Sequence, residues 1–368
     1  MWQITDNKDW ASLEQQFEWV RVMASVPQDA RHHAEGNVAV HTQMVLEQLL
    51  QQQAYRELTP QDQETLWAAA LLHDVEKYST TVQEPDGRIT SAGHARKGEM
   101  RVRQILYRDM PTPFFIRETI AKLVRYHGLP LWVFDKKDPQ KAVIMASLEV
   151  DTRLLALLAR ADALGRTCDD QADLLYRLDC FEELCRDNQC WGVPRVFASA
   201  AARMNYLLKD DVSPDYVPYE QPQPQVIMMS GLPGAGKDTL VQQQYKDWPV
   251  ISLDDIRRAM KIAPTDKSGN GTVIQAAKEQ AREHLRKGRS FVWNATNITR
   301  QMREQLTSLF FTYHAAVTIV YVEVPAARLL QQNGRREHIV PAAAMERLIS
   351  KLEVPSLTEA HEVIYQLR

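Results

Sequence analysis

The sequence predicts a chain of two domains, an all-α domain followed by an α/β domain with a parallel sheet. Its 368 residues are enough for two domains of ordinary size. Before a proline-rich stretch at residues 212–225, apolar residues recur at the spacing of helices. After that stretch, short apolar strands alternate with helical segments, which is typical of βαβ units. These observations predict the two fold classes in that order.

Helices account for the structure expected before residue 212. Gln, Glu, Leu, Ala and Arg are frequent there, and runs of β-branched residues are scarce. We expect helices at residues 37–54, 62–72, 96–107, 114–126, 140–161 and 172–185.

The α/β part is expected to begin with a buried strand at residues 226–229. Further apolar stretches predict strands at 250–251, 291–293 and 317–322. The helices between and after them are expected near residues 238–246, 272–287, 300–310, 326–332 and 341–352.

The stretch at residues 212–225 contains four prolines and no glycine. Proline stiffens an extended chain, so we interpret the stretch as a linker. The expected domains are then residues 1–211 and 226–368. The alternative is a long surface loop inside one domain.

Composition excludes several classes of protein. Hydrophobic residues make up 45% and charged residues 25%, as in ordinary globular proteins rather than collagen-like or disordered ones. No apolar run is long enough to predict a membrane span, and the first residues do not resemble a secretory signal. Four cysteines are too few for a disulfide scaffold in a chain of this length. We therefore expect a cytoplasmic protein without a membrane partner.

The net charge of −3 taken alone argues against nucleic-acid binding. It hides an asymmetry, however. Residues 1–224 contain 25 basic and 33 acidic residues, whereas residues 225–368 contain 19 basic and 14 acidic ones. The second part, with a net charge of +5, is therefore the part expected to meet nucleic acid.

Residues 231–239, GLPGAGKDT, follow the strand at 226–229 and precede a helix. Glycines in such a loop turn backbone N–H groups toward phosphates, and the helix N-terminus adds positive potential. Lys237 would reach the β- and γ-phosphates of a nucleotide. Asp238 stands where a Ser or Thr usually ligates Mg²⁺, and Thr239 cannot simply be assumed to replace it. An accidental glycine turn is the alternative.

Two further segments carry charges suited to phosphoryl transfer. In SLDDIRR, the carboxylate of Asp254 follows a short strand and could accept a proton from an attacking hydroxyl. Arg257, one helical turn later, could hold an acceptor phosphate by two hydrogen bonds. Arg335 and Arg336 could close over the nucleotide phosphates. The alternatives are an Asp that caps an exposed helix and an arginine pair on a solvated face.

The run GLPGAGKDT, LDDIR, WNATN and LLQQNGRR resembles the 5′-OH polynucleotide kinase family of P-loop phosphotransferases over nearly all of residues 225–368. The resemblance implies that Asp254 is the general base, that Arg257 binds the phosphate next to the acceptor nucleoside, and that Arg336 is a lid arginine on the ATP phosphates. With Lys237, Asp254 and Arg336 form the expected catalytic set. The expected nucleotide-binding residues are Gly231, Gly234, Gly236, Lys237, Asp238, Thr239, Arg335 and Arg336.

Three positions of this resemblance have less defined roles. Asn294 and Asn297 match the short Asn/Thr motif of the family. Gln332 aligns with a second lid arginine, so that contact is missing or is supplied by Arg335.

The histidines of the first part suggest a metal site. His73 and Asp74 end the apolar helical run of residues 66–72. Adjacent imidazole and carboxylate groups suit divalent ions such as Mn, Fe, Co or Ni. Asp162 lies in a largely apolar segment, where a carboxylate needs a partner. The alternative for any single histidine is an ordinary surface or core residue.

The combination of His41, His73, Asp74 and Asp162 resembles the HD superfamily of metal-dependent phosphohydrolases over most of residues 20–205. The resemblance implies that these four side chains hold one ion and that Asp74, His94 and His127 hold a second. His33 is expected to contact phosphate, although it competes with His41 as a ligand. Lys77 and Arg166 are further candidate phosphate contacts. Two divalent ions can clamp a phosphate and lower the pKa of a bridging water.

The four cysteines, Cys168, Cys180, Cys185 and Cys190, include no C-x-x-C pair and have no histidine nearby. We interpret them as packing residues on helices rather than as zinc ligands.

The two domains together resemble the bacterial HD-Pnk enzymes, which heal broken RNA or DNA ends. The resemblance implies phosphorylation of 5′-OH ends with Mg²⁺ and ATP or another NTP. It also implies removal of a 2′-, 3′- or 2′,3′-cyclic phosphate by a site with two divalent transition metals, Mn, Co, Ni or Fe. A polynucleotide ligase is the expected functional partner.

Two other functions remain open from the sequence. One is an HD nucleotide phosphohydrolase fused to a small-molecule kinase. Arg257 argues against it, because a free nucleoside has no adjacent phosphate to bind. The other is a regulatory module in which Asp238 disables the P-loop and the chain only binds nucleotide or nucleic acid.

Overall fold

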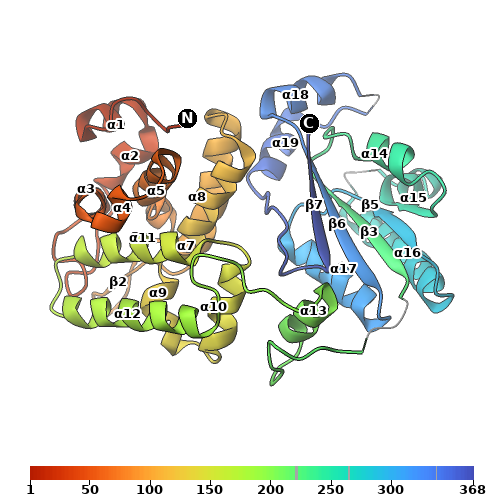
Figure 1. Ribbon diagram of the computed structural model, residues 1–368. Helices are drawn as coiled ribbons and strands as arrows, with labels where there is room; N and C mark the ends of the chain where they lie inside the picture. Colours follow the sequence, from red (N-terminus) through yellow and green to blue (C-terminus); the bar gives the residue numbers. More distant parts are fainter. Residues whose placement is uncertain (220–222, 264–265, 337) are drawn as a thin grey trace. The chain divides into compact units, whose positions relative to one another are not determined.

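A computed structural model describes residues 1–219, 223–263, 266–336 and 338–368 (Figure 1). The chain divides into two compact units, Met1–Val196 and Phe197–Arg368. We describe each unit by itself. None of the helices in these described ranges is long and apolar enough to cross a membrane.

The first unit is helical apart from one small hairpin, which confirms the predicted all-α class. Its helices are α1 (Trp10–Gln16), α2 (Glu18–Met23), α3 (Val38–Gln51), α4 (Gln53–Arg56), α5 (Pro60–Leu72), α6 (Lys77–Thr80), α7 (His94–Gln104), α8 (Phe114–Tyr126), α9 (Leu129–Trp132), α10 (Pro139–Ser147), α11 (Thr152–Leu164) and α12 (Gln171–Asp187). The hairpin pairs β1 (Val82–Gln83) with β2 (Ile89–Thr90), a π-helical turn follows α7 at Ile105–Asp109, and a 3-10 turn follows α9 at Val133–Asp135.

Helix α5 forms the centre of this unit. Its residues from Thr65 to Leu72 are all buried, and it packs against α3, α8 and α11. The end of α11 approaches α3 very closely: a Cβ on Gly165 would lie 2.7 Å from Cγ2 of Val45. Glycine at this position therefore allows the carboxyl end of α11 to meet α3, which brings Asp162 next to His41.

The prediction of a single helix at residues 140–161 is wrong, because the structure has two helices there. Helix α10 ends at Ser147, and α11 begins after Asp151. The Asp151 carboxylate accepts hydrogen bonds from the backbone N–H groups of Arg153 (2.8 Å) and Leu154 (3.1 Å). Apolar spacing continues across this turn, so periodicity alone could not show the break.

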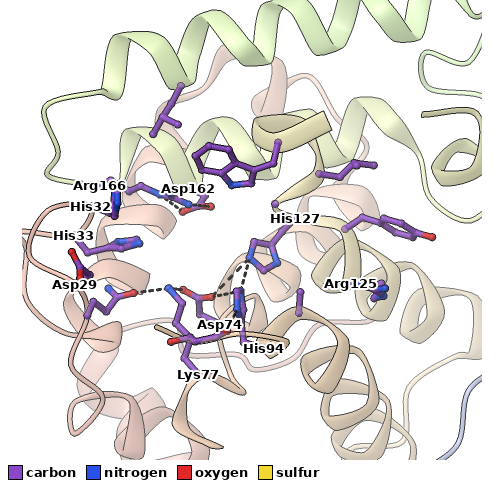
Figure 2. A pocket seen from close by; sticks show the side chains of 18 of the residues that line it. Asp29, His32, His33, Asp74, Lys77, His94, Arg125, His127, Asp162 and Arg166 are labelled. Atoms are coloured by element: carbon purple, nitrogen blue, oxygen red, sulfur yellow. Dashed lines mark hydrogen bonds and ion pairs between the residues drawn. The ribbon is translucent and has the colours of Figure 1, made fainter. Parts of the chain in front are cut away.

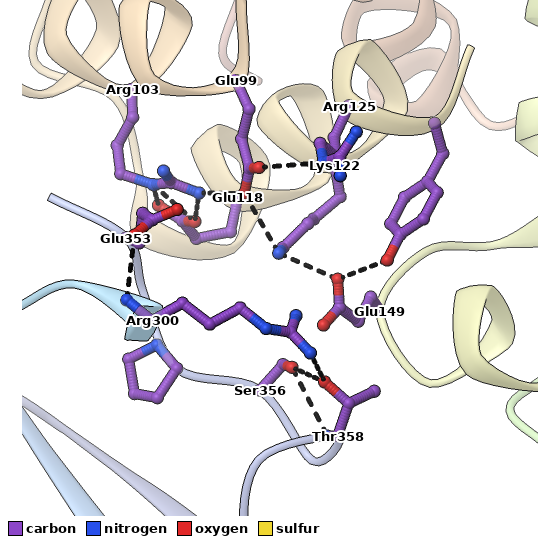
Figure 3. Close-up of polar contacts among 12 residues, drawn as sticks. Glu99, Arg103, Glu118, Lys122, Arg125, Glu149, Arg300, Glu353, Ser356 and Thr358 are labelled. Atoms are coloured by element: carbon purple, nitrogen blue, oxygen red, sulfur yellow. Dashed lines mark hydrogen bonds and ion pairs between the residues drawn. The ribbon is translucent and has the colours of Figure 1, made fainter. Parts of the chain in front are cut away.

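A buried network of charges joins α7 to α8 (Figure 3). Arg103 Nη2 lies 2.9 Å from carboxylate oxygens of both Glu99 and Glu118. Lys122 Nζ lies 3.0 Å from Glu99 and 2.9 Å from Glu149. Burial alone would raise the pKa of Glu99, but the charges of Lys122 and Arg103 hold it at about 2. The ion pairs thus keep these buried carboxylates ionised.

The second unit contains a five-stranded sheet in which all neighbouring strands are parallel, as predicted. The strand order is β4-β5-β3-β6-β7. The strands are β3 (Gln225–Ser230), β4 (Val250–Ser252), β5 (Phe291–Asn294), β6 (Ala316–Glu323) and β7 (Glu362–Leu367). The helices are α13 (Ala200–Leu208), α14 (Lys237–Gln244), α15 (Leu253–Ala259), α16 (Lys267–Arg286), α17 (Arg300–Thr312), α18 (Ala326–Gly334) and α19 (Ala342–Ile349).

Strand β3 lies in the middle of the sheet and leads directly into the glycine-rich loop. Because the strands are parallel, their carboxyl ends meet at one edge, where ligands of open α/β sheets bind. The sequence did not predict β7, which pairs only with β6 at the sheet margin and is only partly buried. Such an edge strand lacks the continuous apolar run that marked the central strands.

The division between the two compact units lies between Val196 and Phe197, before the domain boundary expected at residue 211. Helix α13 belongs to the second unit, because the Arg203 side chain donates to the carbonyl oxygens of Leu357 (3.2 Å), Ala360 (3.1 Å) and His361 (2.6 Å). The composition of α13 resembles that of the helices before it, so composition could not show on which unit it packs.

We predict that Glu99→Gln destabilises the first unit at neutral pH by roughly 3 kcal/mol, because it leaves buried cations without their full partner. The pKa of Glu99 is about 2 in the folded chain and lies below its ordinary value of 4.5. Its contribution is therefore complete above pH 4.5 and is lost as the pH falls toward 2.

Urea unfolding of the variant and the unchanged protein between pH 7 and pH 3 measures this contribution. The stability difference should shrink as the pH falls. Glu47→Gln, at an exposed position of α3, serves as the control and should show a difference close to zero throughout. A difference for Glu99→Gln that is independent of pH would contradict the prediction.

Candidate active sites

The expected metal ligands of the first unit come together from five helices. Figure 2 shows four of them, Asp74, His94, His127 and Asp162. His41 lies on α3, and His73 and Asp74 follow α5. His94 begins α7, His127 follows α8, and Asp162 lies on α11. All six side chains are at least partly buried. The sequence interpretation therefore named side chains that the fold does bring together.

Asp74 lies at the centre of this group and faces two pairs of histidines. Its Oδ2 is 3.2 Å from His73 Nε2 and 3.8 Å from His41 Nε2. Its Oδ1 is 3.5 Å from His94 Nε2 and 3.9 Å from His127 Nε2. One carboxylate oxygen thus faces each pair, which is the arrangement required for a carboxylate that bridges two ions.

Hydrogen bonds fix the orientation of three imidazoles. The Nδ1 atoms of His73, His94 and His127 lie 2.7, 2.8 and 2.8 Å from the backbone carbonyl oxygens of Ala70, Ser91 and Val124. A carbonyl only accepts, so each Nδ1 carries the proton and each Nε2 presents its lone pair to the cluster. This is the tautomer that a metal-binding histidine needs.

Ligand atoms without hydrogen-bond partners also indicate that this group of side chains could hold divalent ions. His73 Nε2 and Asp74 Oδ1 are buried and form no hydrogen bonds with the described residues. The buried Nε2 of His41 faces the Asp162 carboxylate, with 3.1 Å between Nε2 and Oδ1. Leaving buried polar atoms unpaired is costly, so such atoms indicate a missing partner. Mixed imidazole and carboxylate ligands suit Mn, Fe, Co, Ni or Zn.

The electrostatics of the group keep its carboxylates ionised and shift the pKa values of its histidines in different directions. Burial lowers the pKa of His127 to about 3 and that of His33 to about 4. Burial alone would raise the pKa of Asp74, but the charges of His73 and Lys77 hold it well below its usual range. The pKa of His41 is raised, because hydrogen bonds to Asp162 and Glu35 outweigh its burial. A metal at His41 would therefore displace a proton.

Glu35 is a site residue that the sequence interpretation missed. Its Oε1 lies 2.9 Å from His41 Nδ1 and 2.8 Å from His33 Nδ1, and its Oε2 accepts from the backbone N–H of Thr167 at 2.9 Å. Glu35 therefore orients the imidazole of His41 from behind, as carboxylates often do at metal sites. The only signal in the sequence was its place two residues after His33, a residue of the HD resemblance.

The expected phosphate contacts lie beside the ligands. Lys77 Nζ is 2.8 Å from Asp74 Oδ2 and donates to Gln28 Oε1 at 2.6 Å. Arg166 donates to both oxygens of Asp162, at 3.0 and 2.7 Å. Both cations thus offset the charge of the ligand carboxylates. They line, together with His33, a cavity of about 660 Å³ that the cluster opens into.

Part of the lining of this cavity is apolar. Trp132 is 40% exposed, and the Arg177 guanidinium lies 5.2 Å from the centre of its ring. Asp173 holds Arg177 by a hydrogen bond of 3.0 Å, so the tryptophan has a fixed neighbour on one side. Other apolar residues of this lining are Leu129, Ala142, Met145 and Leu174.

In the second unit, the glycine-rich loop follows β3 at the carboxyl edge of the sheet. Gly231 has a φ of +141°, and a Cβ there would lie 2.4 Å from the carbonyl oxygen of Val322, so only glycine fits. Lys237 Nζ donates to the carbonyl oxygens of Gly231 (2.9 Å) and Leu232 (3.0 Å). Burial lowers the pKa of Lys237 to about 8, and the charge of Asp238 opposes this shift. The lysine thus lies over the loop, where phosphates would displace its bonds to carbonyls.

Asp254 and Arg257 form an ion pair in the first turns of α15. The cap of this helix is Ser252, whose side chain accepts from the backbone N–H of Asp255 at 3.2 Å, so Asp254 is not needed as a cap. Arg257 Nε donates to Asn270 Oδ1 at 3.2 Å. The Asp254 side chain is exposed, and its charge acts on Lys237. Asp254 and Arg257, the expected base and phosphate ligand, are thus adjacent at the start of α15.

The lid arginines differ in their surroundings. Arg336 Nη1 is buried and forms no hydrogen bond within the described ranges, and its charge helps to lower the pKa of Lys237. Arg335 is exposed. Gln332 has an amide orientation that satisfies two neighbours. Its nitrogen donates to the Gly234 carbonyl oxygen at 2.7 Å, and its oxygen accepts from Arg328 Nε at 3.1 Å. The glycine-rich loop is therefore contacted by the neutral Gln332, at the position that aligns with a second lid arginine of the resembled family.

The two asparagines of the WNATN motif both contact the loop region. Asn297 adopts a left-handed backbone with a φ of +43°, and its Nδ2 donates to the Met229 carbonyl oxygen at 2.7 Å. Asn294 Nδ2 donates to Asp238 Oδ1 at 2.7 Å. Asn297 therefore supports the backbone of β3, and Asn294 contacts the unusual aspartate.

The four cysteines are free. Among the described residues, none of the clusters that could hold a metal includes a cysteine.

Comparison with known families agrees with this division. Residues 38–167 match the HD domain, and residues 226–355 match an AAA domain. The chain therefore contains an HD phosphohydrolase-type domain followed by a P-loop domain of the kinase-like AAA type, which confirms the architecture implied by the sequence.

Individual relatives match only parts of the chain. Transcription factor bHLH140 of Arabidopsis thaliana is 24% identical over 182 residues, which cover 46% of this chain and 19% of that protein. The multifunctional CCA protein of Methylococcus capsulatus is 33% identical over 122 residues, 33% of this chain and 26% of that protein. The chain thus spans about a fifth to a quarter of the length of these curated relatives.

Similar solved structures cover less than half of the chain. A sugar kinase from Janibacter has a TM-score of 0.32 at 19% identity, and covers 40% of this chain and 86% of its own. A chain of the Pnkp1/Rnl/Hen1 complex has a TM-score of 0.30 at 17% identity, and covers 34% of this chain and 43% of its own.

We predict that Glu35→Gln lowers the metal affinity of the first unit about 10- to 100-fold, because His41 loses the carboxylate that orients it and raises its basicity. Metal retained after dialysis against a graded chelator, measured by mass spectrometry, gives the affinity. Glu57→Gln, the same change at an exposed position, is the matched control. Equal retention by both variants would show that Glu35 does not position His41.

Proposed function

We propose that this chain, an HD domain followed by a P-loop domain, heals both ends of a broken nucleic acid. The P-loop domain phosphorylates a 5′-OH end with ATP or another NTP. The HD domain removes a 2′-, 3′- or 2′,3′-cyclic phosphate from a 3′ end. The observation that carries the proposal is the Asp254–Arg257 pair beside the P-loop, because it joins a base to a phosphate ligand.

In the kinase reaction, Asp254 accepts the proton of the 5′-hydroxyl as this oxygen attacks the γ-phosphate. Arg257, held by Asn270, binds the phosphodiester on the 3′ side of the same nucleoside. Lys237 and Arg336 bind the transferred group and offset its charge. The buried Nη1 of Arg336, which forms no hydrogen bond with the described residues, supports this role, since such an atom next to a P-loop is suited to a phosphate oxygen. Mg²⁺ bound with the nucleotide would neutralise the remaining phosphate charge.

In the phosphatase reaction, the HD cluster holds the metals and orients the phosphate. Divalent ions bound there would polarise the phosphate and lower the pKa of a bound water. Lys77, Arg166 and His33 lie at the cavity wall, where they would contact phosphate oxygens. The apolar wall around Trp132 suits a nucleobase, because every base has a face that can stack. A cavity lined by both charged and apolar residues supports a terminal nucleotide as substrate.

Several finer parts belong to the same proposal. Mn, Co, Ni or Fe in the HD site fits its nitrogen and oxygen ligands. RNA and DNA ends are both candidate substrates. The products, a 5′-phosphate and a 3′-OH, are the substrates of a polynucleotide ligase, which is the proposed functional partner.

We predict that the two activities are separable. Asp74→Asn removes the bridging carboxylate and should reduce phosphate removal to background, with 5′ phosphorylation unchanged. Lys237→Ala should do the reverse, because it removes a phosphate ligand from the other unit. An oligonucleotide with 5′-OH and 3′-phosphate ends reports both reactions in one assay, run with and without ATP and with each metal. Loss of both activities from either variant would contradict separate sites.

We also predict that Asp254→Asn lowers 5′ phosphorylation by a factor of about 10² to 10⁴, the usual contribution of a general base. Asp255→Asn is the matched control, because this neighbouring aspartate is also exposed, and it should stay within about threefold of the unchanged protein. Rates are compared for a 5′-OH oligonucleotide, a nucleoside 3′-phosphate and a free nucleoside. Equal rates for the free nucleoside would support a small-molecule kinase instead, and transfer that survives Asp254→Asn would exclude the assigned base.

A further inference from the structure

The residue after the P-loop lysine is the strongest departure of this chain from ordinary P-loop proteins. In those proteins a Ser or Thr at this position ligates Mg²⁺ together with an aspartate of a Walker B strand. Here the position holds Asp238. A carboxylate in place of a hydroxyl changes the charge of the site, so the remaining ligand should show a matching change.

The neighbouring strand carries a neutral residue at the place where a Walker B aspartate would stand. Strand β5 pairs in parallel with β3, with Trp293 opposite Met228, so Asn294 lies at the carboxyl edge close to the start of the loop. Asn294 also pairs with Ser252 of β4, the residue that caps α15. Its Nδ2 donates to Asp238 Oδ1 at 2.7 Å. The side chain next to the P-loop is thus acidic, and the side chain of the adjacent strand is neutral.

We propose that Asp238 and Asn294 have exchanged the two roles of a P-loop magnesium site, so that the P-loop supplies the carboxylate and the adjacent strand supplies the neutral oxygen. The inference rests on the nucleotide chemistry proposed above for the second unit.

The donor set fits Mg²⁺, which takes oxygen ligands and usually one or two carboxylates beside nucleotide phosphates. The hydrogen bond uses the amide nitrogen of Asn294 and one carboxylate oxygen of Asp238. Asp238 Oδ2 and Asn294 Oδ1 then supply one charged and one neutral oxygen. This is the same total as a hydroxyl and an aspartate, with the charge carried by the other element.

Charge also makes the two residues dependent on each other. An aspartate at both positions would place two carboxylates within hydrogen-bond distance, which is strongly unfavourable unless one is protonated. A neutral residue at both positions would leave the pair without a carboxylate. Only the two mixed combinations provide one carboxylate and a neutral partner, so a change at one position requires the opposite change at the other.

Thr239 does not offer the same geometry. It is the third residue of α14, and its side chain is exposed. Successive side chains on a helix are turned by about 100°. The Thr239 hydroxyl therefore points to a different side of the helix from Asp238, whose carboxylate contacts the strand.

The test measures metal binding itself, with Mn²⁺ as a probe for Mg²⁺. Electron paramagnetic resonance follows Mn²⁺ binding to the full chain saturated with ATP, with the HD cluster blocked by Asp74→Asn in every protein. Asp238→Ser and Asp238→Asn should each weaken Mn²⁺ binding at least tenfold. The exchanged variant Asp238→Ser/Asn294→Asp should recover to within about threefold of the parent. Asp255→Asn, the same change at an exposed aspartate of α15, should have no effect.

The outcomes separate the possibilities. Unchanged Mn²⁺ binding by Asp238→Asn would overturn the exchange, and this holds even if the double variant does not fold, since Asp→Asn keeps the size of the side chain. A double variant that unfolds at the same temperature as the parent but binds no better than Asp238→Ser would overturn it as well. Loss of binding in Thr239→Val but not in Asp238→Asn would assign the ligand to Thr239 instead.

The same proteins distinguish this inference from the proposed function. If the parent binds Mn²⁺ with ATP but phosphorylates no 5′-OH end, the polynucleotide assignment fails. The comparison of the Asp238 variants still decides whether Asp238 and Asn294 have exchanged their roles as metal ligands. It measures Mn²⁺ binding, which does not depend on the molecule that accepts the phosphate.

Discussion

The buried carboxylate of Asp74 is the interaction on which the first unit depends. Only 2% of this residue is exposed, and an isolated charge at such a position costs several kcal/mol. Lys77 at 2.8 Å and the surrounding imidazoles offset that cost. The helices that bring these groups together are the ones that form the core around α5. The same helix packing therefore forms the core and brings together the charges that compensate Asp74. A metal that binds the cluster would stabilise the folded state of this unit.

The second unit solves a different problem, because its site is open and must leave room for a nucleotide. Gly231 brings the loop against the Val322 carbonyl, and Asn297 ties the WNATN turn to β3. Rigid backbone at the carboxyl edge of a parallel sheet then positions exposed side chains such as Asp254. In the first unit buried charges define the site, whereas in the second unit backbone geometry does so.

The sequence predicted the parts of the fold and the sites that depend on local pattern. Helix spacing identified α3, α5 and α8, and the glycine-rich loop identified the phosphate site. The expected ligands His41, His73, Asp74 and Asp162 followed from a resemblance rather than from spacing. Glu35 was missed because its role depends on contacts with His41 and Thr167 that only the tertiary fold creates. The break before α11 was missed because apolar spacing continues across the turn between the end of α10 at Ser147 and Asp151, which caps α11.

The contact between Asp238 and Asn294 shows why single positions mislead. Read alone, Asp238 suggests a disabled P-loop. The two residues are 56 positions apart in the sequence, but their side chains meet at 2.7 Å. A similar error applies to the net charge of −3. The carboxylates of the first unit include those that would hold cations, and each divalent ion adds about two charges to its site. The charge that a nucleic-acid end meets is therefore set by each site with its metals, and the formal sum over the chain does not argue against binding.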